Sequence, residues 1–245
     1  LAAYAPGVTA GLARAATEVA GWVSTQVELA ELGRERARAT EAELAALRAQ
    51  ISPHFIYNSL GAIASFVRTD PDRARELLLE FADFTRYALR RGGAFTTLAD
   101  ELRNVERYLV LEQARFGDRL HIHLLIAPEV LAVSLPYLAI QPLVENAVRH
   151  GLAAKEGIGT VTLTASDRGA EAEIVVEDDG VGADPDRIRA ILDGTAEGES
   201  HGIGNVDSRL RAVYGDDCGL VVETAPGAGT RCSFRIPKFA PHTLS

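Results

Sequence analysis

The sequence is poor in the residues that mark secreted, membrane-spanning and nucleic-acid-binding proteins. It has two cysteines and no methionine among 245 residues, so a disulfide framework is excluded and a reducing compartment is favoured. No run of about 18 uncharged apolar residues is present, which predicts no membrane contact by these residues, and the first residues do not show the basic start and apolar middle of a signal peptide. Asp and Glu outnumber Lys and Arg by 34 to 25, for a formal net charge of −9. Because affinity for a phosphate backbone comes largely from basic side chains, nucleic acid is excluded as a default partner.

The composition is otherwise that of a folded globular protein. Hydrophobic residues make up 47% and charged residues 24% of the chain, which excludes wholesale disorder. At roughly 100–200 residues per domain, the length allows one large domain or two ordinary ones. The chain begins at Leu1 without an initiator methionine, so we expect it to be part of a longer protein or a processed product.

Residues 12–51 have the pattern of a long helix that pairs with another helix. The segment has no proline, and small or apolar residues recur at alternating spacings of four and three. Such spacing, about 3.5 residues on average, is typical of a coiled-coil seam. Gln26, Gly33 and Thr40 occupy seam positions and weaken it. A dimerising helix that transmits a signal is predicted, and a solitary amphipathic helix packed on a domain is the alternative.

Start and stop signals predict three further helices, over residues 54–67, 71–91 and 98–116. Ser52-Pro53 and Asp70-Pro71 each suit an N-cap followed by the first helical position. Gly92-Gly93 is expected to end the second of these helices. Residues 1–117 are therefore predicted to be essentially all helical.

The pattern changes after Gly117. Alternating or apolar runs predict strands near residues 119–126, 160–166, 171–178, 219–224 and 230–236. Helical patterns are expected over residues 136–150, 185–193 and 205–214. Strands and helices mixed in this order favour an α+β sandwich, with helices on one face of a mixed sheet. The predicted fold is a helical region followed by this α/β sandwich.

Three segments of the second region have the composition of a nucleotide site. The first holds Asn146, Arg149 and His150 at the end of an apolar helix. An Asn oxygen suits a Mg²⁺ ion that bridges phosphates, and Arg149 suits a phosphate oxygen. The alternative is a polar helix end that faces water.

The second segment holds Asp178, Gly180 and Gly182 directly after an apolar strand. A carboxylate at a strand end can accept a hydrogen bond from an exocyclic amine, and the glycines let the backbone approach a ligand closely. A tight acidic turn is the alternative.

The third segment holds Gly202 and Gly204 at the opening of a helix. Glycine-rich loops at helix N-termini bind phosphates through free backbone N–H groups. A fourth piece, residues 227–230, places the hydroxyl of Thr230 beside flexible backbone at a strand start. The occurrence of all four pieces in this order predicts a nucleotide-binding domain.

This order of segments resembles the ATP-binding domain shared by gyrase, MutL and sensor histidine kinases. Residues 50–60, which contain His54 and Asn58, resemble the phosphoacceptor segment of LytS-like sensor histidine kinases. Residues 141–151 resemble the nucleotide box of the same kinases. The resemblance covers about residues 44–237.

The resemblance implies roles for the matching residues. His54 would accept the γ-phosphoryl group of ATP, Asn146 would ligate Mg²⁺, and Asp178 would bind the adenine amine. Arg149 and His150 would lie near the phosphates.

The glycines and Thr230 would shape the rest of the site. Gly180 and Gly182 would form the adenine pocket, and Thr230 would support its end. Gly202 and Gly204 would form the hinge of a lid over about residues 183–201, whose closure excludes water.

The sequence departs from the family pattern at two places. Ser200 stands where the lid motif commonly has glycine. Phe55 follows His54, where better-known sensor kinases have an acidic residue that is thought to act as base, so no base is assigned. Asn58, one helical turn after His54 and on the same face, matches a position associated in those kinases with dephosphorylating the partner.

The predicted function is therefore that of a sensor histidine kinase core, which autophosphorylates on His54 and passes the phosphoryl group to an Asp of a response regulator. The predicted domains are a signalling helix, a dimerisation and phosphoacceptor domain, an ATP-binding domain and a tail, over residues 1–50, 51–117, 118–238 and 239–245. The chain is expected to be a homodimer through its N-terminal helices. It is also expected to be cytoplasmic, with the full-length protein anchored in the membrane by an upstream part. The alternatives are an anti-sigma-type serine kinase with the same ATP fold and a non-catalytic, nucleotide-gated interaction module.

Overall fold

The computed structural model describes residues 52–89, 94–195 and 201–239. The predicted coiled-coil helix over residues 12–51 lies outside these ranges. From Pro53 onward the chain forms one compact unit. None of the helices in the described part of the chain is long and apolar enough to cross a membrane.

Three helices come first, α2 (Pro53–Phe66), α3 (Pro71–Ala88) and α4 (Leu98–Phe116), and all three were predicted. Asp70 caps α3 as expected, because its side chain accepts the N–H of Arg73 at 3.0 Å. The helix ends at Ala88, before the predicted residue 91. Thr97 caps α4 in the same way and accepts the N–H of Asp100 at 3.2 Å.

Two short strands correct the predicted pattern. β1 (Phe95–Thr97) pairs antiparallel with β3 (Ser134–Pro136). The prediction that residues 1–117 are essentially all helical is therefore wrong at β1, and the helix predicted from Pro136 begins only at Gln141. The two strands stabilise each other across a long stretch of sequence, and neither carries a local pattern that predicts this partner.

A five-stranded mixed sheet follows, as predicted, with the strand order β2-β4-β5-β7-β6. The strands are β2 (Leu120–Ile126), β4 (Gly159–Asp167), β5 (Glu171–Asp178), β6 (Val221–Thr224) and β7 (Thr230–Pro237). β2 and β4 are parallel, and each of the other neighbouring pairs is antiparallel. The predicted hairpin is confirmed as β6 and β7.

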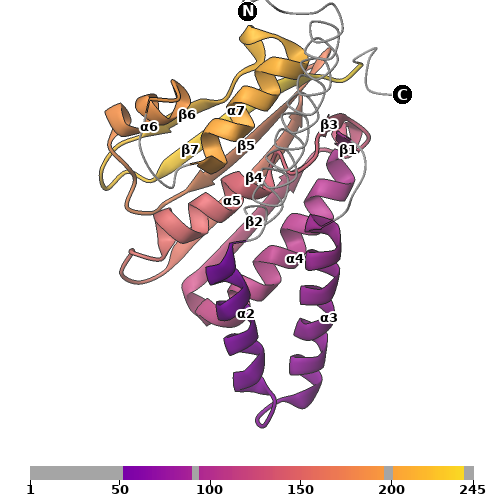
Figure 1. Ribbon diagram of the computed structural model, residues 1–245, viewed down its shortest axis with the longest axis vertical. Helices are drawn as coiled ribbons and strands as arrows, with labels where there is room; N and C mark the ends of the chain where they lie inside the picture. The colour runs from indigo at the N-terminus through magenta and orange to yellow at the C-terminus, as the bar shows by residue number, and fades with distance from the viewer. Residues whose placement is uncertain (1–51, 90–93, 196–200, 240–245) are drawn as a thin grey trace, which may run out of the picture. The chain divides into compact units, whose positions relative to one another are not determined.

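Helices cover one face of this sheet (Figure 1). They are α5 (Gln141–Asn146), the π-helical turn η3 (Ala147–Leu152), α6 (Pro185–Leu192) and α7 (His201–Tyr214). Leu163 of β4, Ile174 of β5 and Leu210 of α7 are fully buried in the layer between the sheet and the helices. α7 begins at His201, four residues before the predicted start at Asn205, so Gly202 and Gly204 are helical.

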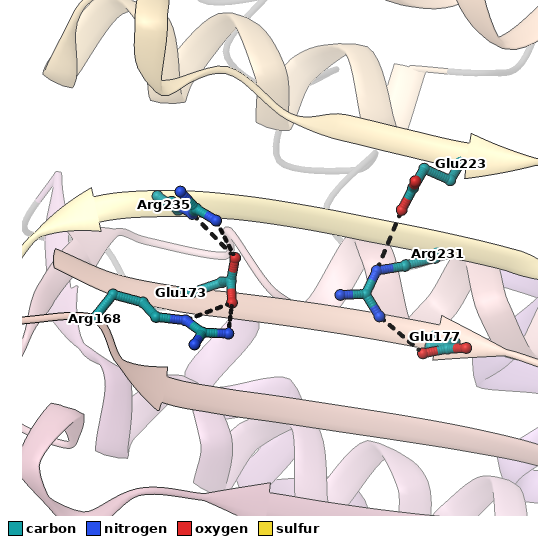
Figure 2. A network of polar contacts seen from close by, with 6 residues as sticks. All are labelled: Arg168, Glu173, Glu177, Glu223, Arg231 and Arg235. Carbon is teal, nitrogen blue, oxygen red and sulfur yellow. Dashed lines mark hydrogen bonds and ion pairs between the residues drawn. The ribbon is translucent and has the colours of Figure 1, made fainter.

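The opposite face of the sheet carries a network of charges (Figure 2). The carboxylate of Glu173 on β5 binds Arg168 at 2.6 Å through one oxygen and Arg235 on β7 at 2.9 Å through the other. Hydrogen bonds from Arg168 and then from Arg235 lower the pKa of Glu173. Arg231 similarly contacts Glu177 at 3.2 Å and Glu223 at 3.3 Å. Alternation along the strands thus places charge on one face and the core on the other.

A buried carboxylate joins α4 to the segment that leads into α5. Glu101 is 1% exposed, and it accepts the backbone N–H of Leu138 at 2.7 Å and that of Ile140 at 3.2 Å. The hydroxyl of Tyr87 on α3 donates to the same carboxylate at 2.9 Å. Burial raises the pKa of Glu101, and these hydrogen bonds oppose that effect. α4 therefore contributes directly to the position of α5, and the predicted domain boundary near Gly117 stays a prediction.

Candidate functional site

His54 lies in the first turn of α2 and is exposed to solvent. The side-chain amide nitrogen of Asn58 lies 2.9 Å from Nδ1 of the imidazole ring. The two residues share one helix face, as their spacing predicted. This contact involves Nδ1 and not the other ring nitrogen, Nε2.

Phe55 points away from this exposed pair and into the helical core. Its side chain is 4% exposed, and its ring centroid lies 4.9 Å from those of Phe84 on α3 and Tyr108 on α4. Aromatic rings at this separation contribute both burial and specific contact. The residue that follows His54 therefore packs the three helices together.

Asp178 occupies the end of β5 and is 5% exposed. Its Oδ1 accepts the backbone N–H of Gly180 at 2.9 Å. Burial raises the pKa of Asp178 to about 6, and the charge of Asp179 adds to this effect. Backbone hydrogen bonds from Gly180 and Thr230 lower it. The fold thus brings Asp178, Gly180 and Thr230 together from two of the predicted segments.

Gly151, at the end of the nucleotide box, lies against Asp178. A Cβ built on Gly151 would overlap Oδ1 of Asp178, and a Cβ built on Gly180 would overlap the carbonyl oxygen of Gly151. The N–H of Val181 donates to that carbonyl at 3.0 Å. Gly151 was not among the predicted site residues, because its contact with Asp178 arises only in the folded chain.

Gly182 and Gly229 complete the turns around Asp178. Gly182 has φ +64°, and a Cβ on it would overlap the carbonyl oxygen of Ala225. Gly229 has φ +77°, and a Cβ on it would overlap the carbonyl oxygen of Asp178. Both positions therefore need glycine for backbone conformation and for close backbone approach.

The hydroxyl of Thr230 lies 3.1 Å from that of Thr224 on β6. Thr224 also accepts the N–H of Ala183 at 2.9 Å. It thereby ties the hairpin to the loop that follows Asp178. Sequence reasoning missed Thr224, whose only signal was its place at the end of a predicted strand.

Asn146 is the last residue of α5 and is half-buried, and Arg149 and His150 are exposed on η3. A π-helical turn holds more residues than an α-helical one and is frequent at functional sites. Through Gly151, η3 connects this group to the loop of Asp178. Among the described residues there is no cluster of three or more His, Cys, Asp or Glu that could hold a metal ion.

Gly202 and Gly204 lie in the first turn of α7, as the helix is described. A Cβ on Gly202 would lie 3.8 Å from Cβ of Pro142 on α5, and one on Gly204 would lie 3.1 Å from the carbonyl oxygen of Ile191 on α6. The first turn of a helix has backbone N–H groups without an intrahelical partner. The predicted phosphate-binding role of Gly202 and Gly204 stays a prediction.

Comparison with known families accounts for both halves of the described chain. Residues 42–120 match the family described as histidine kinase, and residues 133–240 match that of the histidine kinase-, DNA gyrase B- and HSP90-like ATPases. The uncharacterized protein YwpD of Bacillus subtilis is 38% identical over 81% of this chain and 71% of its own length. The chain belongs to the histidine kinase family.

Two sensor proteins are among the relatives of this histidine kinase. Sensor histidine kinase YpdA of Escherichia coli is 36% identical over 96% of the chain, and sensor protein LytS of Bacillus anthracis is 32% identical over 88%. The chain spans 41% of YpdA and 37% of LytS, which is less than half of either relative. The predicted resemblance to LytS-like kinases is confirmed.

Proposed function

We propose that this chain is the core of a two-component sensor kinase, which transfers the γ-phosphoryl group of ATP to His54 and then passes it to an Asp of a response regulator. The observation that carries the proposal is the exposed His54, hydrogen-bonded to Asn58, on a helix of the same compact unit that holds an ATPase-like sheet. The names of YpdA and LytS as sensor proteins support it.

The buried end of β5 suits the adenine ring. The carboxylate of Asp178 would accept a hydrogen bond from the exocyclic amine, and the surrounding Gly180, Gly182 and Thr230 would line the ring. A buried carboxylate favours a ligand that carries a hydrogen-bond donor. A ligand without a donor leaves the buried carboxylate without a hydrogen-bond partner, which costs binding free energy.

The polar residues of α5 and η3 suit the phosphates. Asn146 would hold Mg²⁺ through its side-chain oxygen. One or two protein ligands are sufficient for Mg²⁺, because the ion usually keeps water molecules and phosphate oxygens as its other ligands. The ion would supply charge neutralisation on the phosphates. Arg149 and His150, both exposed, would contact phosphate oxygens, and Gly202 and Gly204 would act as the hinge of the lid.

At the acceptor, Asn58 orients the imidazole. Attack by Nε2 needs a lone pair on that nitrogen and therefore the ring proton on Nδ1. For this step the amide group of Asn58 would turn so that its oxygen accepts from Nδ1–H, which holds the ring in one rotation with Nε2 facing the phosphorus atom. Most of the catalytic effect of such an enzyme comes from positioning and charge neutralisation, since phosphoryl transfer has little covalent chemistry for the protein to perform.

Labelling with ATP that carries radioactive phosphorus at the γ position tests the proposal. We expect an acid-labile, alkali-stable label that mass spectrometry maps to His54. His54→Gln should abolish the label, and His121→Gln should retain it, because His121 is exposed on β2 far along the chain. An equally labelled His54→Gln variant contradicts the assignment.

The same experiment separates the two alternatives. An anti-sigma-type serine kinase would label a partner protein with acid-stable phosphate. A nucleotide-gated module would bind ATP with Mg²⁺ and transfer nothing.

Exposed apolar side chains on α2 and α3 support a homodimer. Tyr57 is 76% exposed, and Leu78 and Leu79 are 51% and 56% exposed. These side chains lie on two helices that pack on each other, and they are apolar surface that a second copy of the chain would cover. Sedimentation of the chain should give a dimer, and Tyr57→Ser with Leu79→Ser should shift it toward monomer.

A further inference from the structure

Glu112 is a buried carboxylate that the mechanism above leaves without a role. It lies on α4, and its side chain is 4% exposed. Its partner Arg115 donates through Nε at 2.9 Å and also through Nη2, and both bonds go to Oε2. The other oxygen, Oε1, lies outside this ion pair. Carboxylates are rarely buried without a structural or functional reason.

The packing of α2 on α4 places Glu112 beside the first turn of α2. The ring of Phe55 contacts that of Tyr108 in a tilted arrangement, at a centroid separation of 4.9 Å. Glu112 follows Tyr108 by four residues, one helical turn along the same face. His54 directly precedes Phe55, so the acceptor histidine and Glu112 occupy neighbouring turns of two packed helices.

The electrostatics agree with this placement. Burial raises the pKa of Glu112, whereas the charge and hydrogen bonds of Arg115 and the charge of His54 lower it. The groups that act on Glu112, or on which its charge acts, are Arg115 on its own helix, His54 on α2, Glu145 on α5 and Tyr108 on α4. Arg115 and His54 are the two groups among these that can carry positive charge.

We propose that Glu112 is a positioning residue for His54. The carboxylate of Glu112 stabilises the positive charge that the imidazole of His54 gains during phosphoryl transfer. This inference rests on the proposed function. In the transfer, a ring nitrogen of His54 forms a bond to the γ-phosphorus, and the bond to the bridging oxygen breaks with its electron pair leaving on ADP. The ring is positive until the proton on its other nitrogen passes to water, and that interval is where the carboxylate acts.

Glu112 thereby supplies negative charge that the sequence does not place next to the acceptor. Phe55, the residue after His54, is committed to the aromatic core with Phe84 and Tyr108. A carboxylate from α4 reaches the same region through tertiary packing, and its low exposure keeps water from screening its effect.

The test compares Glu112→Gln with wild-type protein in the whole chain, by the initial rate of His54 labelling at saturating ATP from pH 5.5 to 9. We expect the rate to fall about tenfold or more, with the KM for ATP unchanged, because the loss affects the charged transition state only. The ratio of the wild-type rate to the variant rate should rise with pH as Glu112 ionises and then level off.

Glu106→Gln is the matched control, because Glu106 is an exposed glutamate on the same helix. Its rate ratio should stay near one at every pH. Glu112→Asp keeps the charge on a shorter side chain and should recover part of the rate. Thermal melting and binding of a fluorescent ATP analogue check that each variant is folded.

A merely structural role for Glu112 predicts a different result, with lower melting temperature or weaker ATP binding and a rate ratio that is constant across pH. That result overturns the proposal, as does a Glu112→Asp variant no faster than Glu112→Gln. If wild-type protein is never labelled at His54, the proposed function itself is contradicted. This outcome is seen before any variant is compared, so it is distinguishable from a failure of the Glu112 proposal.

Discussion

The carboxylate of Glu101 on α4 accepts the backbone N–H of Leu138 at 2.7 Å, and Leu138 is the single non-glycine residue with positive φ, 55°, in the described part of the chain. The left-handed conformation costs about 1–2 kcal/mol for a residue with a Cβ. One buried carboxylate thus holds a strained turn directly before α5, the helix that ends at Asn146. The helical region and the proposed nucleotide site therefore share a structural element.

Glu101→Gln should destabilise the protein by about 1–3 kcal/mol. A Gln side chain has one acceptor oxygen, so it cannot accept the N–H groups of both Leu138 and Ile140 through separate oxygens as the carboxylate does. Urea denaturation followed by circular dichroism measures the loss. The exposed Glu106→Gln on the same helix should change the free energy of unfolding by less than about 0.5 kcal/mol. Equal losses in the two variants contradict this account.

Asp178→Asn should weaken ATP binding by about tenfold or more, because the amide places a donor where the adenine amine needs an acceptor. Asp179→Asn is the matched control. Asp179 bonds to Lys155 at 2.8 Å and to the N–H of Thr160 at 2.7 Å, and it has no assigned part in binding. Calorimetric titration with ATP should show little change for this control. A similar loss in both variants assigns the effect to the loop and not to the carboxylate of Asp178.

The raised pKa of Asp178, about 6 against an ordinary 3.8, makes stability depend on pH. The folded protein holds this proton more tightly than the unfolded chain does. The resulting contribution to the free energy of unfolding, at most about 3 kcal/mol, is therefore fully present below pH 4 and lost as pH rises through about 6. Denaturation at a series of pH values should show this fall in wild-type protein and not in Asp178→Asn. Identical pH curves for the two proteins rule it out.

Gly182→Ala should cost clearly more stability than Gly169→Ala. Both glycines have positive φ, +64° and +83°, so both substitutions carry a left-handed strain of about 1–2 kcal/mol. A Cβ on Gly169 meets nothing within 4 Å, whereas one on Gly182 overlaps the carbonyl oxygen of Ala225. The difference in urea midpoint between the two variants isolates this steric overlap, and equal midpoints exclude it.

Asn58→Ala should slow labelling of His54 severalfold without changing the affinity for ATP, because the imidazole loses the amide that orients it. Asn58→Asp keeps an acceptor oxygen for an Nδ1–H group and should retain more of the rate than Asn58→Ala. Nitrogen-15 spectra of the imidazole report the tautomer in each variant. The role of Asn58 in dephosphorylating a partner, which the family resemblance implies, stays a prediction.

Local sequence signals were sufficient for much of the fold. Proline after a capping residue marked the start of α3, and the apolar period of α4 gave its ends at Leu98 and Phe116. The Asp178 segment was recognised because a carboxylate and glycines follow a buried strand. These signals are reliable because capping, periodicity and backbone freedom depend on residues only a few positions apart.

The errors and omissions involve residues that are distant in the sequence. β1 and β3 are too short to show a pattern, and their pairing holds Pro136 in a strand where the sequence favoured a helix. Glycines 202 and 204 were expected in a loop, but α7 includes both because the helix packs on α5 and α6. In each case a tertiary contact outweighed the local propensity.

By itself, the sequence determined the chemistry that this histidine kinase has available: a histidine in a segment that resembles a phosphoacceptor, an amide one turn away, and glycine-rich segments around one aspartate. Only the tertiary structure decided which groups act on one another. It brought Gly151 against Asp178, placed Glu101 under the turn at Leu138, and buried Glu112 one helix away from His54. These relationships come from the packing of α4 against α2 and against the segment before α5, and the burial of a charged group is a property of that packing which no local pattern encodes.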